Sequence, residues 1–121
     1  MKKYGLIGKS LGHSFSPAFF STYFKEHQID ASYELIPMED ITPIESVLSK
    51  AYNGLNVTIP YKEEIIPYLD EIDAEARAIG AVNTIVFKDE KSTGFNTDAF
   101  GFQQSIKPFF HGLFIGDIIF G

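Results

Sequence analysis

The sequence predicts an α/β fold, a three-layer sandwich in which helices cover both faces of a mostly parallel sheet. Short apolar runs rich in β-branched residues alternate along the chain with stretches that carry helix signals. Parallel neighbouring strands need a crossover connection, and a helix in each crossover packs on the sheet. The 121 residues contain no internal repeat and no linker-like tract, so we expect one principal domain with its own core.

Four strands are predicted, each bounded by turn-forming residues. The last is the clearest, because AVNTIVFK at 81–88 is rich in β-branched residues and precedes the polar turn DEKST at 89–93. The other three strands are expected at 3–9, 32–37 and 54–59.

Four helical regions are predicted from capping signals and periodicity. Ser16 is the expected N-cap of the first region, with Pro17 at the first helical position. Gly80 is expected to end the third region, since glycine readily adopts the left-handed conformation found there. The regions are 16–28, 41–51, 60–79 with a break near Pro67, and a last helix from Thr97 or Asp98 to about 110.

Composition and charge exclude several classes of protein. The chain is 45% hydrophobic and 21% charged, as is ordinary for a soluble globular protein. It has no cysteine, which excludes disulfides and thiolate metal sites and agrees with a cytoplasmic location. No run approaches the roughly 20 apolar residues of a membrane helix. The net charge of −6 argues against nucleic acid as the main partner.

Two asparagines stand out in otherwise apolar strands. In the stretch GLNVTIPYK at 54–62, Asn56 and Thr58 share one face of a predicted strand, about 7 Å apart. Asn83 lies in the strand at 81–88 and needs a hydrogen-bond partner, which either the backbone or a ligand could supply. Asn56 is expected near the carboxyl end of its strand, where open α/β sheets bind their ligands, whereas the strand at 81–88 does not by itself place Asn83 at such an end.

Lys62 is a candidate general acid or base. If Pro60 occupies the first position of a helix, Lys62 lies in the first turn, where the helix dipole disfavours a cation. A lysine at such a place, next to a strand end, is a candidate for proton transfer. The alternative is an exposed lysine that pairs with Glu63 and Glu64.

Two helix N-termini carry further candidates. Ser14 and Ser16 follow the first strand, where hydroxyls and free N–H groups can hold a carboxylate or a phosphate. Capping alone is the alternative for Ser16. Asp98 would stabilise the last helix through its dipole, or accept a hydrogen bond from a substrate hydroxyl. The three histidines show no metal-ligand spacing, so no metal site is expected.

Four motifs in register resemble those of the shikimate dehydrogenase family, in its N-terminal substrate-binding domain. The resemblance covers about residues 3–110 and implies the aminoacid dehydrogenase-like fold of that domain. The family reduces 3-dehydroshikimate to shikimate with NADPH, in the pathway to aromatic amino acids. The motifs are GHSFSP at 12–17, NVTIPYK at 56–62, GAVNT at 80–84 and GFNTDAFG at 94–101.

The resemblance assigns roles to seven residues. Lys62 and Asp98 would form the catalytic pair, in which the Lys62 ammonium protonates the substrate oxygen as hydride reaches the carbon. Lys62 would also contact the substrate. The remaining substrate-binding residues would be Ser14 and Ser16 at the carboxylate, and Asn56, Thr58, Asn83 and Asp98 at the ring hydroxyls.

Two stretches depart from the family pattern, and the chain is shorter than a family member. The loop GKSLGHS has Lys9 and Ser10 where the family often has a proline, and residues 19–22 are FFST where it usually shows a His-Asn pair. We expect a shikimate-binding domain at 1–111, followed at 112–121 by the start of a missing cofactor domain or a non-native tail. NADP should bind that second domain through a Gly-rich loop, so this chain alone should be inactive.

The resemblance leaves two alternatives open. One is the quinate/shikimate dehydrogenase branch, which accepts an additional substrate and often uses NAD. The other is a non-catalytic, stand-alone binding fragment that keeps the pocket residues by descent. In each case we expect a small-molecule ligand and no nucleic acid or membrane partner. Dimer formation is one further expectation.

Overall fold

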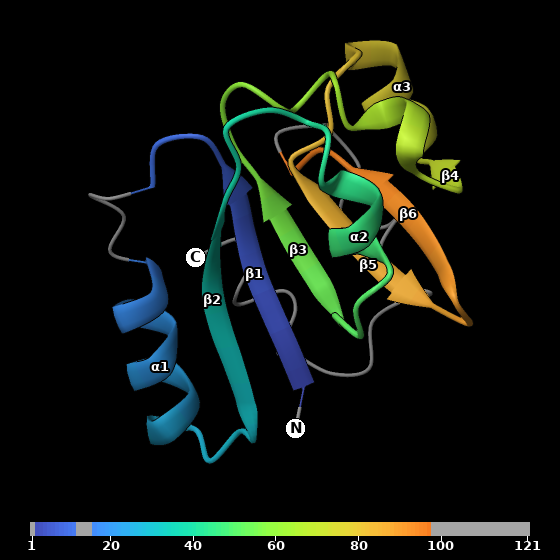
Figure 1. Ribbon diagram of the computed structural model, residues 1–121. Coiled ribbons are helices and arrows are strands. Elements are labelled where there is room, and N and C mark those ends of the chain that lie inside the picture. The colour runs from blue at the N-terminus through green and yellow to red at the C-terminus, as the bar shows by residue number, and fades with distance from the viewer. Residues whose placement is uncertain (1, 12–15, 98–121) are drawn as a thin grey trace.

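A computed structural model describes residues 2–11 and 16–97, with the side chains of 16–20 excepted. It confirms the α/β fold and the mostly parallel sheet, which has six strands among the described residues in the order β2-β1-β3-β5-β6-β4 (Figure 1). The strands are β1 (Lys2–Gly8), β2 (Ala31–Pro37), β3 (Gly54–Val57), β4 (Glu71–Ile72), β5 (Thr84–Lys88) and β6 (Lys91–Phe95). The helices are α1 (Ser16–Glu26), α2 (Ile44–Leu48), α3 (Ala74–Ile79) and the single 3-10 turn η1 (Ile66–Tyr68).

The predicted turn at 89–93 is wrong in extent, because most of it belongs to a β-hairpin. Only Asp89 and Glu90 form the loop, with positive φ angles of 53° and 64°. Such angles at both central residues give the tight two-residue turn whose twist matches paired antiparallel strands. Residues 91–95 then run back beside β5 as β6, so β5 is the one antiparallel strand of the described sheet.

The predicted helical region at 60–79 is also wrong over most of its length. Its first part forms turns and then η1, and residues 71–72 pair with β6 as β4. Only α3 is an α-helix; the Asp73 side chain caps it by accepting from the Glu75 N–H at 3.2 Å, and it ends at Gly80 with φ 81°. Lys62 therefore lies in a turn, and the dipole of an α-helix does not act on it.

The remaining boundaries agree with the prediction to within a few residues. The first helix begins at Ser16 itself, and α2 is shorter at both ends than the predicted helix at 41–51. Asn83 lies just before β5 and not inside it. The last predicted helix, to about residue 110, lies outside the described residues.

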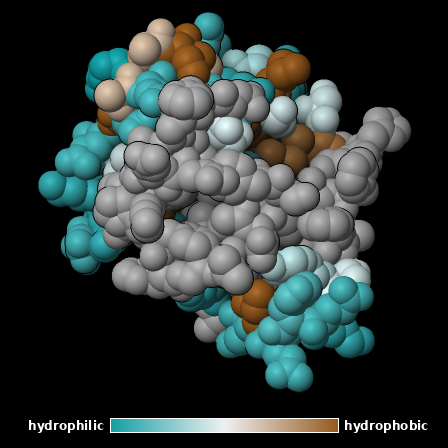
Figure 2. Space-filling model, turned by 180° about the vertical axis from the view of Figure 1, so that it is seen from behind, coloured by the Kyte–Doolittle hydropathy of each residue, from teal (hydrophilic) through white to brown (hydrophobic). Residues whose placement is uncertain are grey.

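The two faces of the sheet carry two separate apolar clusters. On one face, α1 contributes Phe24, which packs with Tyr4 and Tyr33. On the other face, α2 and α3 cover a larger cluster that includes Leu55 and Ile85. Figure 1 shows α1 on the β2 side of the sheet and α2 in front of it. Seen from behind, hydrophilic side chains occupy the left and lower right margins (Figure 2).

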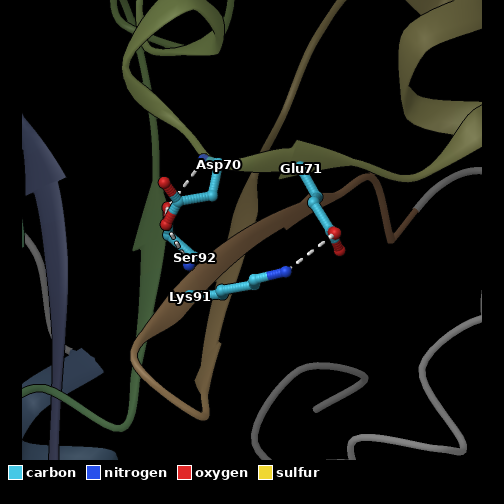
Figure 3. A network of polar contacts seen from close by, with 4 residues as sticks. All are labelled: Asp70, Glu71, Lys91 and Ser92. Carbon is cyan, nitrogen blue, oxygen red and sulfur yellow. Dashed lines mark hydrogen bonds and ion pairs between the residues drawn. The ribbon is translucent and has the colours of Figure 1, made fainter.

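Side-chain hydrogen bonds hold the short edge strand β4 to β6, in addition to the backbone pairing of the two strands. The Asp70 carboxylate accepts from the Ser92 N–H at 2.8 Å and from the Ser92 hydroxyl at 3.1 Å. The Ser92 hydroxyl oxygen in turn accepts from the Asp70 N–H at 3.0 Å. An exposed ion pair joins Lys91 to Glu71 at 3.8 Å (Figure 3). No helix in the part of the chain that the structure describes is long and apolar enough to cross a membrane.

Candidate functional site

Polar side chains from separate segments lie at the end of the sheet where the parallel strands finish. We call this end the first edge, or the site edge, to distinguish it from an edge strand such as β4. The parallel strands β1, β3 and β6 end at this edge, and the antiparallel strand β5 begins there. Asn56 lies near the end of β3, Asn83 directly precedes β5, and Thr97 lies two residues after β6. The reversed direction of β5 is what brings a residue that precedes one strand beside residues at the ends of others.

Backbone hydrogen bonds fix Thr58 and Lys62 at the same edge. The Thr58 N–H donates to the Ile7 carbonyl at 2.8 Å, and the Val82 N–H donates to the Lys62 carbonyl at 2.8 Å. Gly8 leaves the space that Thr58 occupies, because a Cβ at position 8 would lie 2.6 Å from Thr58 Cγ2. The segment that carries both residues therefore lies between the end of β1 and the residues before β5.

The Lys62 side chain is half-buried and has no partner among the described side chains. Glu63 and Glu64 are exposed, and neither forms an ion pair with Lys62 in the described part of the chain. The alternative of a surface lysine neutralised by its neighbours is thus not found in these residues. A half-buried ammonium group with free donors is suited to bind, or to give a proton to, a ligand oxygen.

Asn56 and Asn83 are held by other side chains. Asn56 accepts from the Tyr33 hydroxyl at 2.9 Å and donates to Thr84 Oγ1 at 3.3 Å. Asn83 donates to Thr97 Oγ1 at 2.7 Å, and its Oδ1 accepts from the Thr97 N–H at 2.9 Å. The partner that Asn83 needs is therefore Thr97, a nearby loop residue, and one of its two amide protons has no partner among the described residues.

Sequence reasoning missed Tyr33, Thr84 and Thr97 as hydrogen-bond partners of the two asparagines. The available signal was the rule that a buried amide needs hydrogen-bond partners, which applies to Asn56 and Asn83. The rule does not identify the partners, because Tyr33 and Asn56 belong to β2 and β3, which are separated by β1.

Three of the seven predicted site residues cannot be placed in this geometry. Ser14 and Asp98 lie outside the described residues, and Ser16 begins α1 without a described side chain. The described residues nearest to them in sequence, Thr97 and the first residues after β1, lie at this edge.

Ionisable groups near this edge have clear directions of shift. Burial raises the pKa of Tyr33 far above its ordinary value, so its hydroxyl stays a protonated donor. Burial also raises the pKa of Tyr61, with further contributions from Asp40 and two glutamates, and its hydroxyl donates to the Met38 carbonyl. Hydrogen bonds from Thr42, aided by the Lys9 cation, lower the pKa of Asp40.

A groove of about 670 Å³ lies at the opposite edge of the sheet, away from these residues. It is lined by the hairpin loop and by side chains near the start of β3, including Tyr52 and Phe87. Tyr52 donates its hydroxyl to Glu34, and the charged lining residues include Glu45 on α2, Lys88 on β5 and the exposed turn residues Asp89 and Glu90. The amide, hydroxyl and ammonium groups that the first edge carries favour it as the functional site.

Comparison with known proteins gives one consistent family. The model of the "Shikimate dehydrogenase substrate binding domain" matches residues 6–85. A Clostridium perfringens protein named shikimate dehydrogenase (NADP(+)) is 47% identical over 110 residues, which are 88% of this chain and 41% of that protein. The chain thus spans about two fifths of the curated relatives that it matches.

Two solved structures share the fold of this chain. Shikimate dehydrogenase 1 from Peptoclostridium difficile is 40% identical with a TM-score of 0.75, over 89% of this chain and 42% of that chain. Shikimate 5-dehydrogenase from Thermus thermophilus, in complex with NADP(H) and shikimate, is 33% identical with a TM-score of 0.75 over the same shares.

Proposed function

The chain belongs to the shikimate dehydrogenase family, and we propose that it forms the substrate-binding half of an enzyme that reduces 3-dehydroshikimate to shikimate with NADPH. One observation carries the proposal. Asn56, Thr58 and Lys62, on β3 and the segment that follows it, and Asn83, just before β5, lie at one edge of the sheet. That edge is the place where open α/β sheets bind their ligands.

The ligand of this edge would be a polyhydroxylated carboxylic acid. Asn56 and Asn83 offer amide N–H donors, and Thr58 a hydroxyl, to the oxygens of a ring. Ser14 and Ser16, at the start of α1, would hold the carboxylate, and Asp98 would accept from a ring hydroxyl. The cations Lys9 and Lys62 lie near this edge and favour an anionic ligand, despite the net charge of −6.

Lys62 would supply the proton of the reaction. Reduction of the ketone adds a hydride to the carbonyl carbon and one proton to its oxygen, which gives the alcohol. The Lys62 ammonium would donate that proton and be left neutral, with Asp98 as the second member of the catalytic pair that the family resemblance implies.

NADPH supplies the hydride when it is bound, and the sequence of this chain contains no motif suited to bind it. The sequence has no G-x-G-x-x-G loop between a strand and a helix, so its residues form no recognisable dinucleotide site. We place that site in a second domain, for which the unmatched length of the relatives leaves room. The boundary at residue 111, a cytoplasmic location and dimer formation stay predictions.

A shikimate titration of the 121-residue chain, followed by two-dimensional NMR, tests the proposal. We expect saturable shifts at Asn56, Thr58 and Asn83. Lys62→Ala should bind about tenfold more weakly, because a hydrogen bond from a charged donor is lost. Lys50→Ala removes an exposed lysine beside the opposite groove and should bind like wild type.

The outcomes separate the alternatives. Equal affinity for shikimate and quinate would indicate the quinate/shikimate branch, and a clear preference for shikimate supports the narrower enzyme. A folded wild-type chain without any shift contradicts the proposal and favours a remnant that keeps the residues by descent.

A further inference from the structure

A continuous series of side-chain hydrogen bonds crosses the sheet on one face. The Tyr33 hydroxyl on β2 bonds to Asn56 on β3 at 2.9 Å, over the intervening strand β1. Asn56 bonds to Thr84 on β5 at 3.3 Å, and Thr84 bonds to Asn83 at 3.1 Å. The last bond, from the Thr97 N–H to Asn83, ends the series with a backbone group at 2.9 Å.

The direction of every bond in this series follows from its last member. A backbone N–H can only donate, so the Asn83 atom that meets the Thr97 N–H is the acceptor Oδ1. Thr84 contacts the same oxygen and gives it the single proton of its hydroxyl. Thr84 Oγ1 must then accept from Asn56, which identifies the facing Asn56 atom as Nδ2.

The orientation of the Asn56 amide is thereby fixed. Its Oδ1 points to Tyr33, which donates, because burial keeps that hydroxyl protonated. One Nδ2 proton serves Thr84, and the second is left for another oxygen. Tyr33 is 7% exposed and Thr84 is 2% exposed, whereas Asn56 is half-buried, so a ligand at this edge meets Asn56 and not its partners.

We propose that Tyr33 and Thr84 are positioning residues, which hold the Asn56 amide so that its remaining N–H points to a substrate oxygen. The inference rests on the proposed function of this edge. If the Asn56 amide were flipped, it would present an acceptor oxygen to the substrate in place of a donor. Its Oδ1 would then also face Thr84 Oγ1, which is itself an acceptor in this series. The three bonds from Tyr33 to Asn83 all run from donor to acceptor in the same direction. Hydrogen bonds in such a series strengthen one another, which favours a single orientation of the Asn56 amide.

Tyr33→Phe tests the inference, because it removes the hydroxyl and keeps the ring. In the 121-residue chain, we expect the side-chain amide NMR signal of Asn56 to shift and shikimate affinity to fall about three- to tenfold, as for one lost hydrogen bond. Thr84→Val should weaken binding similarly, and Thr84→Ser, which keeps the hydroxyl, should restore it. The thermal midpoint of each variant identifies any general loss of folding.

Tyr52→Phe is the matched control. It also removes the hydroxyl bond of a buried tyrosine, here to Glu34 and away from the site, and should leave shikimate affinity unchanged. If the wild type binds shikimate and Tyr33→Phe binds equally well, the inference is overturned while the proposed function stands. An unchanged Asn56 amide signal in Tyr33→Phe overturns the inference even where affinity falls. A folded wild type that fails to bind overturns the proposed function first.

Discussion

The two faces of the sheet differ in what they place on the neighbouring strands β3 and β5. Toward α2 and α3 these strands present Leu55 and Ile85, which are paired across the two strands and are 2% and 0% exposed. On the opposite face, the next pair in the same register is Asn56 and Thr84. Adjacent residues of one strand thus belong to an apolar core on one side and to a polar series on the other.

This difference separates stability from recognition. Buried apolar side chains stabilise the fold in proportion to the area that they remove from water. Buried amides and hydroxyls stabilise little on balance and become costly when a partner is lost. The buried Tyr33 and Thr84 hydroxyls and both ends of the Asn56 amide have partners, so the polar series is tolerated, and its use is in presenting a remaining donor to a ligand.

The largest expected effect comes from breaking the apolar face. Leu55→Ala should lower the free energy of unfolding by about 2–5 kcal/mol, because it leaves a cavity in the larger cluster. Asn56→Ala, one residue further on the opposite face, should cost about 1 kcal/mol and lower shikimate affinity instead. Urea unfolding of the two variants measures the contrast. Equal loss of stability from both would contradict the division between the faces.

A smaller effect is expected at the β4 edge, which carries none of the proposed site residues. Asp70→Ala removes the carboxylate that accepts two bonds from Ser92, and should cost about 1–2 kcal/mol in urea unfolding. Lys91→Ala breaks only the exposed pair with Glu71, whose side chains are 66% and 56% exposed, and should change stability by less than about 0.5 kcal/mol (Figure 3). A larger loss from Lys91→Ala would show that the ion pair holds the edge.

The smallest expected effect is a change in the pH dependence of stability. Burial, with the Glu34 hydrogen bond and charge, raises the pKa of Tyr52 to about 12, from an ordinary value near 10. Between these values the unfolded chain has lost the proton and the folded chain keeps it, so stability falls as the pH rises. Tyr52→Phe should flatten this alkaline decline.

Tyr33→Phe should also flatten the decline, because burial raises the pKa of Tyr33 on the other face. Urea unfolding from about pH 9 to about pH 12 measures both slopes. A Tyr52→Phe slope equal to that of the wild type would mean that the hydroxyl is no more protonated in the folded chain than in the unfolded one.

Local signals predicted those parts of the fold that depend on neighbours in the chain. The alternation of strands and helices, the N-terminal part of α1 and the glycine end of α3 all follow from residues within one turn or one strand. The helical prediction at 60–79 failed where Asp70 and Glu71 find partners on β6, about twenty residues further along the chain. The periodicity of apolar residues along the sequence does not identify partners that are this distant in the chain.

The sequence by itself determined which polar groups the chain owns and on which face of a strand each one lies. It placed Asn56 and Thr58 together on one face and Lys62 near the end of a strand. Tertiary structure alone decided that Tyr33 reaches Asn56 across β1, that Thr84 joins the two asparagines, and that Lys62 stays unpaired among the described side chains. The reason is strand order. Which strands become neighbours is settled by burial over the whole chain, and a hydrogen-bond partner is known only when that order is known.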